Sequence, residues 1–239
     1  MNIQALSCIK WSNRDLYVKA GDFMSKMLVT REEIIKGQGL LYDTYKNQRW
    51  QWSEENNPTG FQIKSSDTGM KYITDRFDGK SSIWIGTFHG NKLITSMRLA
   101  FRTDENPFFD LELYHNKESG KTQLDKVLSE KNLTEISRFS TSLEYQNNRV
   151  GGAMTILILA KFLVKYNLSG FTTSQYDFFS KYGYSELVDD SFDYGDGVKT
   201  KVWLYPKNGV RFGLKLFMGN MEQNFKGVTY GWVSPSSKL

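Results

Sequence analysis

Two adjacent glycines ahead of an apolar segment are the first residues of this chain whose type and spacing could do chemistry. Gly151 and Gly152 lie between Val150 and Ala153, and the apolar segment continues to Tyr166. The first amides of a helix have no partner inside the helix and carry the positive end of its dipole, so a helix that begins here can bind an anion. The alternative is that the glycines allow the helix to pack closely against a sheet.

A second candidate is the pair of opposite charges Glu135 and Arg138. Both lie in the segment 133–141, which is predicted to be a strand. Positions three apart in a regular strand face opposite sides of the sheet, so these side chains can share a site only if a β-bulge lies between them. The alternative is that they form structural salt bridges at the sheet edge.

Three charged residues upstream could bind a substrate. Asp75 and Asp78 precede Gly79, so they either form a turn or hold a cationic amine. Arg98 lies in a predicted strand, where it either binds a carboxylate or places a charge on the sheet surface.

Thiol, imidazole and metal chemistry are not indicated. The chain has one cysteine, Cys8, and two histidines, His89 and His115, which fall in an N-terminal segment, a turn and a loop. These residues are too few for a structural zinc site and cannot form an internal disulfide. We therefore expect no metal and no covalent intermediate on a nucleophilic triad.

Composition limits the class of protein. The chain has 239 residues, of which 39% are hydrophobic and 24% charged, and its mean hydropathy is −0.49. The hydrophobic and aromatic content excludes a disordered chain, and no apolar run approaches the roughly 18 residues that span a bilayer. The N-terminus has no basic segment followed by a sustained apolar stretch, so a cytoplasmic location is expected.

The net charge of +5 raises the question of an anionic partner. Along the sequence the basic residues form no block of the kind that binds nucleic acid. Diffuse basicity fits a phosphate-bearing cofactor, an acidic carrier protein or a solvated surface equally well.

The spacing of the apolar residues changes along the chain between the helical period of about 3.6 and the strand period of 2. Helical spacing predicts a helix over 29–52, and alternation predicts a hairpin of 82–88 and 93–99 around a Gly-Asn turn. After this hairpin the sequence predicts a strand at 133–141, a buried helix at 150–166 and a strand at 170–174. A helix at 176–182 and strands at 184–188 and 199–205 follow. This order predicts a mixed α+β fold.

Two segments resemble the GNAT superfamily of acyltransferases. Residues 148–153 resemble its Q/R-x-x-G-x-G/A pyrophosphate loop, and 178–184 resemble the F-Y-x-K-x-G-F segment that ends the fold. The resemblance implies a three-layer domain over 1–206, with a mixed, mostly antiparallel central sheet flanked by helices and an N-terminal helical region. The tail 207–239 is expected to pack on this domain. It further implies that an acyl thioester donor binds at Asn148, Arg149, Val150, Gly151, Gly152 and Ala153.

A narrower resemblance is to the acyl-homoserine lactone synthases and the long-chain N-acyl amino acid synthases. Residues 135–139 resemble their E-x-S-R-F strand, 75–78 their D-x-F-D, and 98–99 their R-L. The resemblance implies catalytic roles for Glu135, Ser137 and Arg138, and substrate binding by Asp75, Asp78, Arg98 and Trp50. Two positions depart from the pattern: Leu40 and Leu41 stand where an arginine is sought, and Phe179 replaces the general-acid tyrosine of many GNAT enzymes.

These features predict an N-acyltransferase that moves an acyl group from acyl carrier protein or acyl-CoA to the amine of a small molecule, such as an amino acid or S-adenosylmethionine. Glu135 is the expected base, and an amide freed by a bulge would polarise the thioester. The basic surface favours the carrier protein as donor. The alternatives are an acetyl-CoA-dependent small-molecule N-acetyltransferase and a non-catalytic thioester-binding module. The aromatic residues of the tail are expected to cover the acyl pocket.

Overall fold

A computed structural model describes residues 16–47, 57, 59–79, 81–113, 123–174, 184–193 and 199–232. Its main sheet has nine strands in the order β11-β1-β2-β5-β6-β7-β8-β10-β9. Only β7 and β8 are parallel; every other neighbouring pair is antiparallel. The strands are β1 (Tyr17–Ala20), β2 (Phe23–Leu28), β5 (Ser82–His89), β6 (Lys92–Ala100), β7 (Leu133–Thr141), β8 (Ser169–Ser174), β9 (Ser185–Asp193), β10 (Lys199–Tyr205) and β11 (Thr229–Tyr230).

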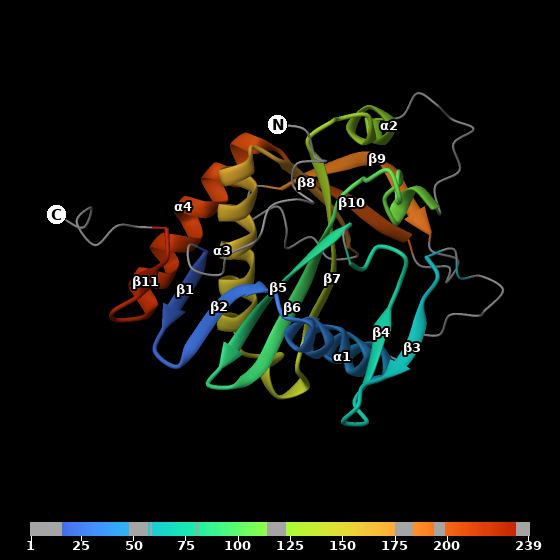
Figure 1. The fold of residues 1–239 in the computed structure, drawn as a ribbon. Coiled ribbons are helices and arrows are strands. Elements are labelled where there is room, and N and C mark those ends of the chain that lie inside the picture. The colour runs from blue at the N-terminus through green and yellow to red at the C-terminus, as the bar shows by residue number, and fades with distance from the viewer. Residues whose placement is uncertain are drawn as a thin grey trace.

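Helices cover both faces of this sheet, which confirms the predicted mostly antiparallel sheet flanked by helices (Figure 1). α1 (Arg31–Asn47) lies on one face, and α3 (Arg149–Tyr166) and α4 (Lys207–Asn224) lie side by side on the other. A two-stranded sheet of β3 (Gln62–Ser65) and β4 (Lys71–Thr74) stands beside α1. The remaining helices are α2 (Gln123–Leu128) and the short 3₁₀ helices η4 (Leu111–Leu113) and η6 (Leu143–Tyr145). Within the described residues, no helix combines the length and apolar character needed to cross a bilayer.

Local signals explain where the helices begin and end. α1 starts with a capping box, because Glu33 N–H donates to Thr30 Oγ1 (3.1 Å) and Thr30 N–H donates to Glu33 Oε2 (3.3 Å). α3 starts at Asn148, whose Oδ1 accepts the amide of Val150 (3.0 Å), and it ends at Asn167 in the left-handed conformation (φ 54°). The helix predicted over 29–52 therefore begins later, at Arg31. Its predicted last residues, 48–52, lie outside the described residues, and so does the predicted helix over 176–182.

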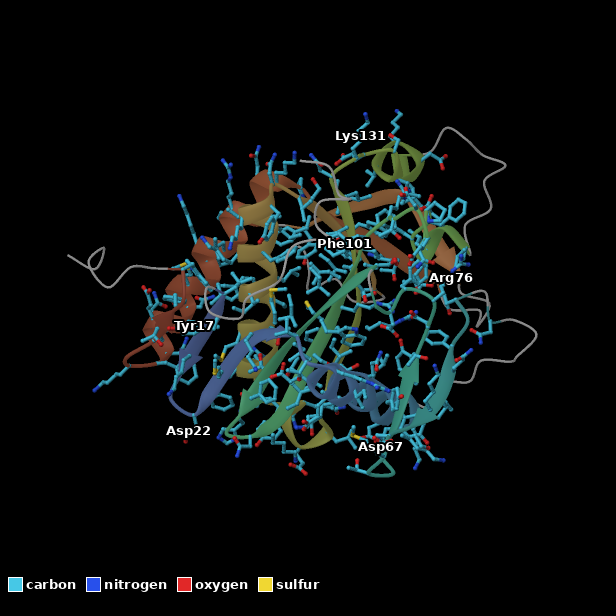
Figure 2. All side chains as sticks on the ribbon, viewed as in Figure 1. Tyr17, Asp22, Asp67, Arg76, Phe101 and Lys131 are labelled. Atoms are coloured by element: carbon cyan, nitrogen blue, oxygen red, sulfur yellow. The ribbon has the colours of Figure 1, made fainter. Side chains whose placement is uncertain are left out.

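The face of the sheet under α3 and α4 is a continuous apolar core. It includes eight buried apolar residues of α3, together with residues of β5, β6 and β7 such as Ile85, Met97 and Ile136. Phe101, labelled in Figure 2, packs against Phe162 of α3 with the ring centroids 6.3 Å apart. The C-terminal segment joins this core through α4, and β11 pairs with β1 to extend the sheet.

Candidate active site

A β-bulge in β7 brings the predicted catalytic residues onto one face of the sheet. Arg98 of β6 is paired with Ser137, but Ser96 is paired with Ser140, so one residue of β6 lies opposite two residues of β7. Arg138 sits in the bulge with a φ of 58°. The extra residue turns Arg138 to the side that Glu135 and Ser137 already occupy, which is the face under α1. The bulge that a shared site requires is therefore present.

Asp75 links the two arginines of the site. Its Oδ1 lies 2.5 Å from Arg98 Nη1, and its Oδ2 lies 3.1 Å from Arg138 Nη2. Burial by itself would raise the pKa of Asp75, but the charges of Arg98 and Arg138 outweigh it and hold that pKa below its usual value. Asp75 is therefore a carboxylate that holds two guanidinium groups together.

The same aspartates also build the turn after β4, so the two interpretations of Asp75 and Asp78 are compatible. Asp75 Oδ1 accepts the amide of Phe77 (2.9 Å), and Asp78 Oδ2 accepts the amide of Asp75 (2.9 Å). Asp78 Oδ1 accepts Trp84 Nε1 (3.2 Å) and lies 3.5 Å from Arg98 Nη1. Because both oxygens of Asp75 are occupied, it has no free atom for a substrate amine.

Asp110, which no sequence motif indicated, completes the cluster. Its Oδ2 lies 2.6 Å from Arg138 Nη2. It is flanked by Phe109 and Leu111, both fully buried in an apolar cluster with α2, β8 and β10. The only signal in the sequence is an acidic residue between apolar neighbours, which does not indicate where the side chain lies.

Glu135 is held by the segment that carries Asp110. Its Oε2 accepts the amide of Asp110 (2.8 Å), and its Oε1 accepts the amide of Leu111 (3.4 Å). Burial, together with the negative charge of Asp110, raises the pKa of Glu135 to about 8. Burial also raises the pKa of Asp110, against the opposing charge of Arg138. The two carboxyl groups therefore differ in surroundings: Glu135 contacts main-chain amides, and Asp110 contacts a guanidinium.

Five buried polar atoms of this cluster have no hydrogen-bond partner among the described residues. Four are hydrogen-bond donors or hydroxyls, and one is a carboxylate oxygen: Arg98 Nε, Arg98 Nη2, Arg138 Nε, Ser137 Oγ and Asp110 Oδ1. Leaving such atoms without partners is costly, and buried groups of this kind are uncommon outside functional sites. The cluster therefore has unused donors and an unused acceptor within one set of contacting side chains.

Aromatic side chains enclose the guanidinium groups. Arg138 Cζ lies 4.4 Å from the centroid of the Phe61 ring, and Arg98 Cζ lies 5.6 Å from that of Phe77. Tyr45 of α1 accepts Arg138 Nη1 at 3.4 Å. Arg138 and Asp78 are the most exposed members of the ion-paired set, with 10% and 15% of their side-chain surface accessible. A ligand would therefore reach the cluster past these two residues.

A pocket of about 570 Å³ lies between α1 and the β5–β6 turn, on the α1 face of the sheet. Its walls come from α1, from the β5–β6 turn and from the segment 141–144. None of Asp75, Asp78, Arg98, Asp110 and Arg138 lines this pocket, so it is separate from the charged cluster.

The two glycines in the first turn of α3 have different surroundings. A Cβ on Gly151 would lie 2.6 Å from Thr95 Oγ1 and 3.0 Å from Ile94 Cδ1, so this glycine is required for packing against β6. A Cβ on Gly152 would make only an ordinary contact, 3.4 Å from Phe139 Cζ in the bulge. Gly151 thus fits the packing explanation, and Gly152 is the glycine that stands between α3 and the bulged strand.

The pairing of β7 with β8 ends where the site begins. The two strands are paired from Leu133 with Ser169 to Glu135 with Phe171, although β7 continues to Thr141 and β8 to Ser174. The residues of β7 beyond Glu135 include the bulge, and they lead to the start of α3. Divergence at this point leaves main-chain groups of β7 without a partner from β8.

Four of the predicted site residues, Asp75, Asp78, Arg98 and Arg138, are joined by ion pairs. Ser137 is paired with Arg98 across the strands, and Glu135 is linked to the group through Asp110. The predicted donor-binding residues 148–153 form the separate first turn of α3, and Trp50 and Phe179 lie outside the described residues. The described residues contain no group of three or more His, Cys, Asp or Glu side chains suited to a metal ion.

Comparison with known proteins gives similarity in structure only. No protein-family model matches the sequence, and no curated protein matches it significantly. An N-acyl amino acid synthase, FeeM, from uncultured soil microbes superposes with a TM-score of 0.53 at 14% identity, covering 82% of this chain and 97% of that one. The CoA-dependent acyl-homoserine lactone synthase BjaI, solved with SAM and isopentyl-CoA, superposes with a TM-score of 0.53 at 11% identity, covering 83% and 88%. The chain therefore has the GNAT-like fold that these acyltransferases share.

Proposed function

We propose that the protein is an N-acyltransferase that moves an acyl group from a thioester donor to the amine of an α-amino acid or a derivative that keeps the carboxylate. The observation that carries this proposal is the set of five unpartnered polar atoms. Arginine and serine donors suit a carboxylate, and Asp110 Oδ1 suits an ammonium group. A polyamine or a sugar amine would leave the buried arginine donors without a partner.

The residues of the cluster then have distinct roles. Arg98 and Ser137 bind the carboxylate of the acceptor, and Asp110 binds its ammonium group and takes one proton from it. The neutral nitrogen attacks the carbonyl carbon of the thioester, a C–N bond forms, and the C–S bond breaks to release a thiolate. The second proton of the nitrogen leaves to the thiolate or to solvent, so the acyl amide and a free thiol result.

In this assignment Glu135 is a positioning residue. Both of its oxygens accept main-chain amides, which fix Asp110 and Leu111 beneath the site. Glu135 was expected to be the base, but Asp110 is the group whose free oxygen belongs to the cluster. Arg138 forms ion pairs with both Asp110 and Asp75, so it fixes the distance between these two carboxyl groups.

The donor is proposed to lie along the unpaired part of β7, with its phosphate groups at the first turn of α3. Helix N-termini bind phosphate through their free amides, and Gly152 and Ala153 are partly exposed there. An acyl carrier protein and acyl-CoA present the same phosphopantetheine thioester, so the donor is proposed by this shared arm and the assay below compares the two sources.

The test is a thiol-release assay in which the acceptor differs only in its carboxylate. Acyl carrier protein, long-chain acyl-CoA and acetyl-CoA are each offered with phenylalanine or phenethylamine, with tyrosine or tyramine, and with S-adenosylmethionine, and mass spectrometry identifies the product. We expect thiol release and an N-acyl product with the amino acid and little with the matched amine. No thiol with any donor would disprove the proposal, and equal rates with both members of a pair would disprove the carboxylate site.

Two variants distinguish the proposed roles of Asp110 and Glu135. Asp110→Asn should lower kcat by at least about 100-fold, the usual contribution of a general base, with a folded protein and little change in donor KM. Glu135→Gln should retain much more activity, because it keeps an oxygen that accepts one of the two amides. If Glu135→Gln is the more damaging change while both variants stay folded, the base is Glu135.

A further inference from the structure

The net charge of the chain is concentrated in the α3 and α4 layer. The two helices carry six basic residues and one acidic residue, a net +5 that equals the charge of the whole chain. α1, on the opposite face of the sheet, carries three basic and three acidic residues, a net charge of zero. The basicity that looks diffuse along the sequence therefore has a local excess in the α3 and α4 layer, which α1 lacks.

Five of these cations lie in the halves of the two helices that are close together. α3 and α4 run antiparallel, so the C-terminal half of α3 lies beside the N-terminal half of α4 (Figure 1). We call the outer surface formed by these five residues the basic face: Lys161, Lys165, Lys207, Arg211 and Lys215. None of them forms an ion pair within the part of the chain that the structure describes.

Aromatic side chains accompany these cations. Phe212 is 59% exposed, and it directly follows the exposed Arg211. Lys161 Nζ lies 5.6 Å from the centroid of the half-buried Trp232 ring. Basic side chains combined with an exposed phenylalanine on a helical surface are typical of proteins that lie in a lipid interface.

We propose that the basic face binds the surface of an anionic lipid bilayer. Charge complementarity supports this partner: each basic residue near such a surface contributes to binding, and Phe212 can enter the headgroup region. Because Arg138 contacts Tyr45 of α1, the charged cluster lies on the face of the sheet opposite α3 and α4, and a bilayer held by these two helices would not cover it.

A carrier protein is the less favoured occupant of this face. Under the proposed function, a phosphopantetheine donor enters at the first turn of α3. Lys161 and Lys165 stand roughly 14 and 20 Å further along that helix, at 1.5 Å per residue. A flat pair of helices carrying scattered cations suits an extended anionic surface better than a partner that must deliver its arm at the opposite end.

The experiment measures sedimentation of the full chain with phosphatidylcholine vesicles that contain or lack phosphatidylglycerol, at low and high salt. The test variant is Lys165→Gln/Arg211→Gln/Lys215→Gln, in which all three exposed cations of the basic face are removed. The matched control is Lys46→Gln/Lys64→Gln/Lys71→Gln, which removes three exposed cations from α1, β3 and β4 and has the same net charge. A third variant, Phe212→Ser, tests the apolar contribution.

We expect the wild type to bind only the anionic vesicles, with binding weakened by salt. The basic-face variant should bind roughly 100-fold more weakly, taking about fivefold for each cation, and the control should bind within about twofold of the wild type. Equal loss in both triple variants would show that only net charge matters and would overturn the proposal.

Absence of wild-type binding to anionic vesicles would also overturn it. So would a basic-face variant that keeps its vesicle binding while its KM for a carrier-linked donor rises, because that result would assign the face to the carrier protein. The vesicle-binding readouts do not depend on catalysis, so the membrane proposal and the proposed acyl transfer can fail separately.

Discussion

The two faces of the central sheet are built on opposite principles, although they share the same strands. On β6, Met97 and Leu99 enter the apolar core under α3, whereas Arg98 between them is buried under α1. On β7, Ile136 faces α3 and Glu135 faces the ion-paired cluster. The apolar face gains free energy from burial, while the charged face loses solvation that ion pairs only partly restore. A protein that needed only stability would not bury charges this way, which is why the charged face is the candidate site.

The largest effect should come from removing one charge of the buried cluster. Arg98→Gln leaves Asp75 and Asp78 without their main partner, and breaking a buried pair in this way costs about 3–5 kcal/mol of unfolding free energy. Urea denaturation measures it. If the loss stays below about 1 kcal/mol, the charged face is more hydrated than its burial indicates.

A cavity on the apolar face should be nearly as destabilising but should leave the site intact. Leu157→Ala in α3 removes a fully buried side chain, for which about 2–5 kcal/mol is typical. The variant should melt earlier yet keep the wild-type acceptor KM at a temperature where it is folded. A changed KM would show that the two faces are coupled through the strands.

The two glycines of α3 should respond in opposite directions. Gly151→Ala places a Cβ against Thr95 and Ile94 and should cost about 1–3 kcal/mol by overpacking. Gly152→Ala has room and should be neutral or slightly stabilising, as Ala generally is within a helix. If the first turn of α3 binds the donor, only Gly152→Ala should raise donor KM while leaving the melting temperature unchanged.

The charged face should also give a pH dependence of stability at Glu135. Because the pKa of Glu135 in the folded protein is raised from 4.5 to about 8, the folded state holds this proton more tightly than the unfolded state. The resulting stabilisation is complete below pH 4.5 and is lost as the pH rises to about 8, by at most about 1.4 kcal/mol per pH unit.

Glu135→Gln should flatten the slope of unfolding free energy between these two pH values. Asp75 acts in the reverse sense, since its lowered pKa contributes stability that is lost on acidification. An unchanged slope in Glu135→Gln, measured by denaturation at several pH values, would contradict the raised pKa.

Much of the fold could be predicted because local patterns agree with the tertiary structure. The strand at 133–141 and the last strand at 199–205 match β7 and β10, and the apolar run after Gly152 is α3. The bulge was foreseen as a requirement, since Glu135 and Arg138 could share a face only through one. α1 begins two residues after the predicted start, because the capping box of Thr30 and Glu33 fixes the first turn at Arg31.

The candidate site was harder to predict where partners are distant in sequence. Asp110 contacts Arg138 across 28 positions, and no motif in its segment predicts that contact. Gly151 lies in a sequence that resembles a phosphate-binding loop. The structure explains this glycine by packing, because a side chain there would collide with Ile94 and Thr95 of β6.

The sequence alone determined the alternation of strands and helices and the positions where charge could enter a strand, because periodicity and capping act within a few residues. Tertiary structure decided which charges meet. Ion pairs such as Arg98 with Asp75, and the gathering of cations from α3 and α4 on one face, depend on the spatial order of elements far apart in the chain. Whether a charge is solvated, paired or left with an unused donor depends on that order, and so does the chemistry it can perform.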